Sequence, residues 1–192
     1  MSFPQPFQEI VTDIGKKLNL FVPVTTKSIN WRYWSTTFDG KACKQCINLY
    51  GKIYPAHGYV SPTPPLHPNC RCAVIALQAV NAGSASYEGR NGADWWIKNY
   101  KILPSYYLSK EDYYLLGWQA GKTPAAHAPG KMMAGGIYRN KDGHLPSAPG
   151  RIWYEADINY YQGKRNGHRI LWSSDGLIFV TYDHYTTFLE IK

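Results

Sequence analysis

The last third of the chain contains a series of short alternating segments separated by tight-turn signals, and this pattern limits the fold more than any other feature. Apolar and aromatic residues alternate with polar ones in "RIWYEADI", "RILWSS", "LIFVTY" and "TTFLEI". Asp142-Gly143 and Asp175-Gly176 lie beside such segments, and Asp-Gly is favoured in hairpin turns because their central residues adopt positive φ. We therefore expect an antiparallel sheet from Ile137 onward.

Helical signals precede this sheet. Residues 93–101 have helical spacing, and Ser109 is placed as a helix N-cap with Asp112 three residues later. The stretch "TPAAHAPG" fits a third helix that starts at Pro124. Helices followed by strands predict an α+β domain, in which three N-terminal helices pack on one face of an antiparallel sheet and the other face is open.

The first half of the chain has a less regular pattern. Apolar residues recur at helical spacing over about 7–18, which predicts a helix, whereas residues 21–59 are irregular. A small, polar, glycine-rich segment then suggests a linker. The sequence thus predicts a small irregular Cys-rich domain over 1–80, a linker over 81–91 and the α+β domain over 92–192.

The composition favours an anionic partner. The 21 Lys and Arg residues exceed the 13 Asp and Glu residues, which gives a net charge of +8 and a pI near 9.2. A basic chain suits a nucleic acid. No apolar stretch is long enough to cross a bilayer, and the N-terminus lacks the basic and apolar regions of a signal peptide. We therefore expect no membrane partner and no signal peptide in this chain.

Charges of both signs gather in the second half. A period of two places Trp153, Glu155 and Asp157 on one face of a strand, and chain reversal in "YYQGKRNG" can bring arginines beside them. Cleavage of RNA through its 2′-OH requires a base, an acid and cations around the phosphorane. Glu155 fits the base and His184 the acid, while the cations are Lys110, Arg165 and Arg169. Such chemistry requires no cofactor.

Each of these residues also has a structural interpretation. Glu155 and Asp157 could form an ion-pair network with the arginines, and His184 could be an exposed loop residue. Lys110 could be a solvated surface charge, although a helix N-terminus prefers anions.

The cysteines form two close pairs, in "CKQC" and in "HPNCRC". Thiolates at both ends of a loop can hold a structural zinc ion in tetrahedral geometry, with Cys43, Cys46, Cys70 and Cys72 as ligands or with His67 in place of one. Disulfides and reduced thiols are the alternatives.

This Cys-rich segment also resembles a known module. The runs "WSTTFDGKACKQCINLYGKIY" and "PPLHPNCRC", within residues 30–76, are similar to the C-terminal signature of phage Mu F-like minor head proteins. The resemblance implies a larger phage or delivery protein as a partner, because related bacterial modules precede variable toxin domains. It also gives the rival hypothesis, a phage head-associated structural or nucleic-acid-binding protein without catalysis.

Residues 92–192 resemble the barnase-like, guanyl-preferring ribonucleases of bacilli. The similarity lies in "LPSYYLSKEDYYLLGW", "APGKMMAGGIYRN", "DGHLP" and the run from "GRIWYEADINYYQGKRNGHRILW" to "TYDHYTTFLEI", in the family's order. It implies the microbial-ribonuclease fold and cleavage of single-stranded RNA to a 2′,3′-cyclic phosphate that is then hydrolysed. It also implies a toxin that is secreted or delivered into the cytoplasm of a target cell, with an acidic barstar-like inhibitor as its partner.

The resemblance assigns roles by matching position. Glu155 matches the general base, His184 the general acid, and Asp157 an acid that pairs with arginines. The phosphate-binding cations match Lys110, Arg165 and Arg169. Tyr185 lies beside the acid and next to the substrate. The base-recognition loop corresponds to Tyr138, Arg139, Asn140, Lys141 and Asp142.

The sequence departs from the family pattern at two positions. Gly136 replaces an acid near the site, which we expect to alter the charge around Lys110 and Glu155. Asp142 stands where the family has glutamate, so the guanine preference follows less directly from the resemblance than cleavage does.

Overall fold

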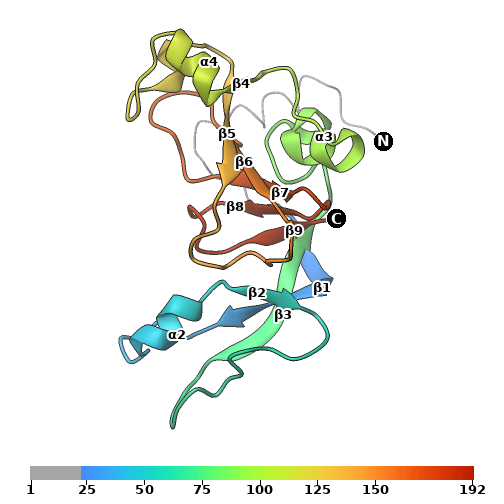
Figure 1. Ribbon diagram of the computed structural model, residues 1–192, viewed down its shortest axis with the longest axis vertical. Helices are drawn as coiled ribbons and strands as arrows, with labels where there is room; N and C mark the ends of the chain where they lie inside the picture. The colour runs from blue at the N-terminus through green and yellow to red at the C-terminus, as the bar shows by residue number, and fades with distance from the viewer. Residues whose placement is uncertain (1–22) are drawn as a thin grey trace.

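The computed structural model describes residues 23–192, within which nine strands form one sheet (Figure 1). The strand order is β2-β1-β3-β9-β8-β7-β6-β5-β4. Two neighbouring pairs, β3–β9 and β4–β5, are parallel, and the others are antiparallel. The fold is α+β, as predicted, while the helix expected over 7–18 lies outside the described residues.

The strands have the following bounds: β1 Thr26–Ser35, β2 Ile53–Pro55, β3 Ala73–Val80, β4 Tyr107–Ser109, β5 Met132–Tyr138, β6 Trp153–Asp157, β7 Arg169–Ser173, β8 Ile178–Thr181 and β9 Leu189–Ile191. The last four strands coincide with the alternating segments of the sequence. Between β7 and β8, Gly176 adopts a φ of 95° and the amide of Ser173 donates to the carbonyl of Leu177 at 2.8 Å. Asp175-Gly176 thus forms the predicted turn.

The helices of the described residues are short and do not form one layer. Their bounds are α2 Lys44–Leu49, α3 Ala93–Tyr100 and α4 Lys110–Leu115, with 3₁₀ turns η1 Gly89–Asn91 and η2 Pro124–Ala126. The N-cap prediction for α4 is confirmed, because Ser109 and Asp112 form a reciprocal capping box. The third predicted helix is only the η2 turn, since Pro129 and Gly130 follow too closely for another helical turn.

Among the helices of residues 23–192, only α3 covers a face of the sheet (Figure 1). Ala93 and Ile97 of α3 pack on strand residues that include Ile170, Ile178 and Val180. By contrast, α4 packs at the β4–β5 edge, where Tyr113 contacts a cluster formed by Leu108, Trp118, Ala128 and Met133. The expectation of three helices on one face is therefore wrong, because α4 buries Tyr113 at an edge and η2 is a single 3₁₀ turn.

The opposite face of the sheet is not fully open. Trp153, Leu171 and Phe179 are buried there under Leu145 and Phe188, together with Ile53 and Leu77 from the first half of the chain. The prediction of an open face neglected this cover, which comes from residues far away in sequence. The face is less enclosed at Glu155, next to Trp153 along β6.

The Cys-rich segment contributes three strands to the sheet, so it is less irregular than expected. Strand β1 pairs with both β2 and β3, and β3 joins β9 through Ala79–Glu190 and Val80–Ile191. A small separate core surrounds Trp34, Tyr54 and Val60. The sequence of β1 does not alternate clearly, because Asn30 and Arg32 are not buried although they lie at even spacing between the buried Ser28 and Trp34. The pairing of β1 with β3 also changes register between Lys27 and Arg32.

The segment 81–91, interpreted from sequence as a linker, is packed against the second half. The Asp94 carboxylate accepts hydrogen bonds from the amides of Gly83 at 2.6 Å and Ala85 at 3.0 Å. The amide of Tyr87 donates to Asn159 Oδ1 at 2.9 Å. These bonds fasten the segment to α3 and to the loop after β6. Within residues 23–192, none of the helices has the length and apolar character needed to cross a membrane.

Candidate active site

Glu155 lies on β6 opposite a bulge in β5. The register changes between Ala134 and Gly136, and Gly136 has a φ of 80°, which favours glycine. A Cβ atom at Gly135 would lie 2.7 Å from Glu155 Cγ. Gly135 therefore leaves room for the Glu155 side chain. Gly136 supplies the positive φ of the bulge, a backbone role that the missing acid at this position did not reveal in the sequence.

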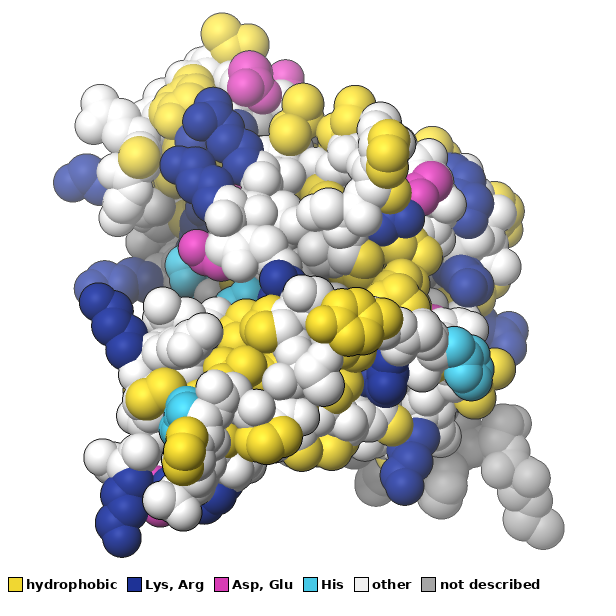
Figure 2. Space-filling view, turned by 60° about the horizontal axis from the view of Figure 1, so that its bottom comes forward, with side chains coloured by type: hydrophobic (Ala, Val, Ile, Leu, Met, Phe, Trp, Pro, Cys, Tyr) yellow, Lys and Arg dark blue, Asp and Glu magenta, His cyan; other side chains and the backbone are white. Residues whose placement is uncertain are grey.

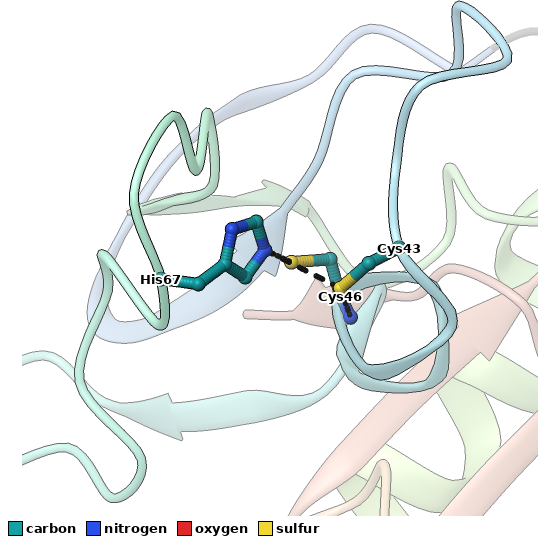
Figure 3. Close-up of side chains that lie close together, drawn as sticks. All are labelled: Cys43, Cys46 and His67. Carbon is teal, nitrogen blue, oxygen red and sulfur yellow. Dashed lines mark hydrogen bonds between the residues drawn. The ribbon is translucent and has the colours of Figure 1, made fainter.

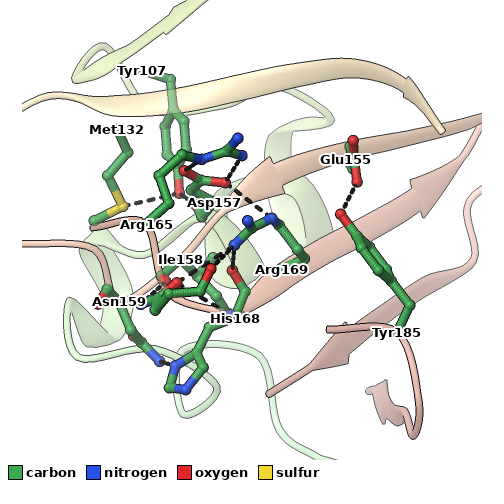
Figure 4. Close-up of polar contacts among 11 residues, drawn as sticks. Tyr107, Met132, Glu155, Asp157, Ile158, Asn159, Arg165, His168, Arg169 and Tyr185 are labelled. Atoms are coloured by element: carbon green, nitrogen blue, oxygen red, sulfur yellow. Dashed lines mark hydrogen bonds and ion pairs between the residues drawn. The ribbon is translucent and has the colours of Figure 1, made fainter. Parts of the chain in front are cut away.

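Tyr185 connects the candidate base to the candidate acid. Its hydroxyl donates a short hydrogen bond to Glu155 Oε2 (Figure 4), and its ring centroid lies 4.7 Å from that of His184. Burial and the neighbouring Glu155 raise the pKa of Tyr185 well above its usual range. The phenol thus stays protonated near neutral pH, and it positions the Glu155 carboxylate by donating to it.

His184 is exposed in the loop between β8 and β9, as the sequence suggested. His184 and Tyr185 have positive φ values of 57° and 73°, a backbone form that costs free energy for residues other than glycine. Neighbouring groups hold this form: the amide of Tyr185 donates to Thr181 Oγ1 at 3.0 Å and the amide of His184 to the carbonyl of Gly167 at 3.1 Å.

Asp183 fixes the rest of this loop. The sequence did not lead us to predict this role. Its Oδ1 accepts from the amides of Thr186 at 3.1 Å and Thr187 at 2.9 Å, and Oδ2 accepts from the Thr187 hydroxyl at 2.6 Å. An Asp three and four residues before two threonines, after a strand, is a signal for such a side-chain-capped turn. The run "YDHYTT" has this pattern, but the pattern alone does not show that the turn exposes His184.

Asp157 holds the two arginines (Figure 4). Arg165 donates from Nε at 2.8 Å and from Nη2 at 2.5 Å, and Arg169 Nε lies 3.1 Å from the same carboxylate. Asp157 is only 1% exposed. Its carboxylate raises the pKa of Arg165, which stays charged. The ion-pair interpretation therefore holds for Asp157, whereas Glu155 bonds to Tyr185.

Asn166 also positions Arg169, and sequence reasoning did not identify it. Arg169 Nη1 donates to the backbone carbonyls of Asn166 and His168, both at 2.7 Å. The Asn166 side chain in turn donates to the carbonyls of Ile158 at 3.2 Å and Asn159 at 2.8 Å. The loop between β6 and β7 thus fixes the guanidinium through its backbone, a contact with no residue-type signature.

Lys110 lies at the same level of the sheet as Glu155. Ser109 pairs with Ala134 on β5, and Gly136 of β5 pairs with Glu155. Lys110 is thus two strands from Glu155, or about 10 Å across the backbone. Its Nζ lies 5.8 Å from the ring centroid of Tyr114, a cation–π distance. The Lys110 side chain is long enough to contact either Tyr114 or an anion bound near Glu155.

The predicted recognition loop follows β5. Asn140 has a φ of 45°, and its side chain accepts from the Leu145 amide at 3.1 Å and donates to the Leu145 carbonyl at 2.9 Å. Tyr138 stacks on Tyr185 with ring centroids 5.0 Å apart, which joins this loop to the candidate catalytic residues. Burial, then Asp142 and Glu155, raise the pKa of Tyr138 to about 12. A hollow of about 560 Å³ borders the loop, lined in part by Tyr138, Arg139, Asn140 and Lys141.

The cysteines lie away from these residues, in the first half of the chain. Two groups of three have their ligand atoms within 4.8 Å of one another: Cys43, Cys46 and His67, and Cys46, Cys70 and Cys72. All four cysteines are free thiols. The structure thus brings together every residue that the sequence proposed for a metal, His67 included.

Known proteins match this chain over the segment that carries the candidate catalytic residues. A ribonuclease family model matches residues 93–192, which is just over half of the chain. This chain belongs to the ribonuclease family. The matched segment includes Lys110, the recognition loop, Glu155, both arginines and His184.

Three curated relatives, each called "Ribonuclease", are similar to this family member. One from Bacillus pumilus is 50% identical over 145 residues, which cover 75% of this chain and 90% of the relative. One from Heyndrickxia coagulans is 50% identical over 101 residues, with 52% and 92% covered. One from Bacillus intermedius is 50% identical over 101 residues, with 52% and 62% covered. The matches thus support the barnase-like resemblance, and the phage-like resemblance of residues 30–76 stays a prediction.

Proposed function

We propose that this ribonuclease is a metal-independent endoribonuclease that cleaves single-stranded RNA by transphosphorylation. Glu155 removes the proton of the 2′-OH, the 2′-oxygen attacks phosphorus, and His184 protonates the departing 5′-oxygen. The resulting 2′,3′-cyclic phosphate is then hydrolysed with the two roles exchanged. The observation that carries this proposal is the placement of Tyr185, whose hydroxyl binds Glu155 while its ring contacts His184.

The cations stabilise the negative charge that develops on the phosphorane. Arg165 is partly exposed, with 31% of its side chain accessible, so a phosphate can reach it. Arg169 is buried beside it and contributes positive potential from a fixed position. Lys110 approaches from the β4 side. Fixed charges of this kind need little reorganisation during the reaction, which favours the transition state.

The proposed base preference is for guanine. Guanine presents the N1–H and N2–H₂ donors together on its Watson–Crick edge, and the Asp142 carboxylate accepts both. The side-chain bonds of Asn140 to Leu145 hold the loop in place for this contact. Tyr138, stacked on Tyr185, offers an aromatic surface next to the reacting centre for the base.

The test uses a short single-stranded RNA with one guanosine, incubated with purified protein in excess EDTA. We expect one cut after guanosine and a cyclic phosphate product detected by mass spectrometry. The matched control replaces that guanosine by 2′-deoxyguanosine, which removes the nucleophile but keeps the base, and should be bound and not cut. Oligonucleotides with adenosine, cytidine or uridine at the same position measure the preference.

Two variants connect the activity to the proposed residues. Glu155→Ala and His184→Ala should each lower kcat by roughly 10²- to 10⁴-fold, the usual contribution of a general base or acid. Circular dichroism of both variants must match that of the parent. RNA that is retarded in a gel but remains intact with the parent protein would instead support the rival hypothesis of a non-catalytic nucleic-acid-binding protein.

The proposed biological role is that of a toxin, secreted or delivered into the cytoplasm of a target cell. Lys and Arg side chains surround much of the face shown in Figure 2, where few acidic side chains are visible. A small acidic inhibitor complementary to such a surface would protect the producing cell. Titration of the ribonuclease with candidate acidic proteins encoded beside it, at several salt concentrations, tests this role.

A further inference from the structure

Five side chains with soft ligand atoms meet at the start of α2 and in the loop before β3. They are Cys43, Cys46, His67, Cys70 and Cys72. Figure 3 shows Cys43, Cys46 and His67 pointing toward one another. Cys46 belongs to both groups of three and is buried, so it is the common centre of the cluster.

The distances fit tetrahedral coordination of a single ion. Cys46 Sγ lies 3.8 Å from Cys70 Sγ. Zinc–sulfur bonds of about 2.3 Å place two sulfur ligands about 3.8 Å apart in a tetrahedron. His67 Nε2 lies 3.3 Å from both Cys43 Sγ and Cys46 Sγ. Three of the four atoms, those of Cys43, Cys46 and His67, lie within 4.8 Å of one another, and Cys70 Sγ joins them through Cys46, so binding of one ion requires the Cys70 sulfur to move toward Cys43 and His67.

The surrounding hydrogen bonds orient the ligand atoms. His67 Nδ1 lies 2.9 Å from the Pro68 carbonyl, which can only accept, so Nδ1 carries the proton and the Nε2 lone pair faces the two sulfur atoms. The Cys46 amide donates to Cys43 Sγ at 3.4 Å, which favours a thiolate there. Cys72 also lies close to Cys46 and Cys70, but its Sγ has a hydroxyl partner, Thr36 Oγ1 at 3.2 Å, which would compete with an ion for that sulfur.

The fold around the cluster needs such a link. Residues 56–72 connect β2 to β3 without a helix or strand, a length at which an ordered loop usually requires its own anchors. The local core is small, with three buried hydrophobic residues, Trp34, Tyr54 and Val60. Cys43 and Cys46 come from α2, while His67 and Cys70 come from this loop, so one ion would join the two segments.

We propose that Cys43, Cys46, His67 and Cys70 bind one structural zinc ion, with Cys72 outside the coordination sphere. Three thiolates and one imidazole select a soft, tetrahedral ion rather than magnesium or calcium. Four protein ligands leave no open position for water, which assigns the ion to structure and not to the chemistry at Glu155. The site is independent of the proposed ribonuclease activity and can be tested without RNA.

The first experiment measures metal content. The full chain, purified without added chelator, should contain one zinc ion per molecule by elemental analysis. Cobalt substitution of the parent protein should give the intense visible absorption of tetrahedral cobalt and the charge-transfer band of cobalt–thiolate bonds. Cobalt needs no variant, so the result does not depend on whether a substituted chain folds.

The second experiment tests the ligand set. Cys46→Ser and Cys70→Ser should lose zinc, whereas the matched Cys72→Ser should keep it. Zinc removal should also increase hydrogen exchange in residues 43–72 more than in β6 and β7. Two results would overturn the proposal: an intact mass lighter by two hydrogen atoms per cystine, which shows disulfides, or loss of zinc in Cys72→Ser with retention in His67→Ala.

Discussion

At the scale of single residues, Asp157 combines burial with ion pairs to two arginines. It is 1% exposed and binds Arg165 and Arg169. Asp157→Asn should lower the free energy of unfolding by about 3–5 kcal/mol, because Arg169 would remain buried beside a neutral group. It should also lower kcat, since both guanidiniums lose their anchor. Urea unfolding and single-turnover cleavage measure the two effects.

Asp175 provides the control for Asp157. It pairs with Arg151 in a fork at 2.7–3.0 Å, but 47% of its side chain is exposed. Solvent screening keeps the contribution of such a pair below about 1 kcal/mol. If Asp157→Asn were no more destabilising than Asp175→Asn, the buried carboxylate would not be the anchor of the two arginines.

The Asp175 pair also has a pH dependence with a defined sign. Hydrogen bonds from Arg151, and then from Ser173, lower the pKa of Asp175 from 3.8 to about 2. A folded-state pKa below the unfolded one adds stability that is present above pH about 4 and is lost as the pH falls toward 2. The stability difference between the parent and Asp175→Asn should thus be larger at pH 5.5 than at pH 2. Urea unfolding at both pH values checks this, and an equal difference would contradict it.

At the scale of elements, the turn before β2 and the start of β2 contact the segment after the predicted recognition loop and the loop that carries His184. The Ile53 amide donates to the His144 carbonyl at 2.8 Å, and His144 Nδ1 lies 3.3 Å from the Tyr185 carbonyl. A Cβ atom at Gly51 would lie only 2.0 Å from the Thr186 carbonyl oxygen. The first half of the chain therefore packs directly on the loop that carries His184.

Gly51→Ala should displace this loop and lower kcat about 10- to 100-fold, because small misplacements of catalytic groups are costly. Gly58→Ala is the matched control: both glycines have positive φ, 83° and 94°, but nothing lies near an added Cβ at Gly58. Both variants should lose stability, and only Gly51→Ala should lose kcat with a small change in KM. Equal kcat values in the two variants would exclude the positioning role.

Elements whose signals are local were predicted well. The capping box of α4 and the Asp175-Gly176 turn each depend on residues within four positions of one another. The alternating strands β6 to β9 were also found. The predictions that failed concern elements with distant partners. Strand β1 pairs with β2 and β3 across long loops. Helix α4 packs at a sheet edge that no sequence pattern marks.

The same distinction applies to the site. Glu155, His184 and the cations come from residue type and from the resemblance, and their catalytic roles stay predictions. Apart from Asp157, the groups that position them were not predicted. The Arg169 bonds to the Asn166 and His168 carbonyls involve only backbone acceptors, and the Gly51–Thr186 approach joins residues 135 positions apart. Such contacts exist only once the chain is folded.

At the scale of the whole molecule, the two halves of the chain share a core. Leu77 of β3 is 2% exposed and belongs to the cluster of Leu171 and Phe179, while Val80 is buried beside Ile191. The parallel β3–β9 pair makes the sheet continuous between the halves. The division into separate domains thus stays an interpretation of the sequence, and we expect the two halves to unfold together.

Leu77→Ala tests this coupling. It removes a buried side chain from the shared cluster and should lower the free energy of unfolding by about 2–5 kcal/mol. The loss should appear equally when unfolding is followed by ribonuclease activity and by tryptophan fluorescence, because one cooperative unit contains both probes. Ile75→Ala on the same strand is the control, since Ile75 is 44% exposed and its truncation should change stability by about 0.5 kcal/mol or less. An unchanged midpoint of activity loss in Leu77→Ala, with fluorescence shifted alone, would show that the ribonuclease half folds independently of β3.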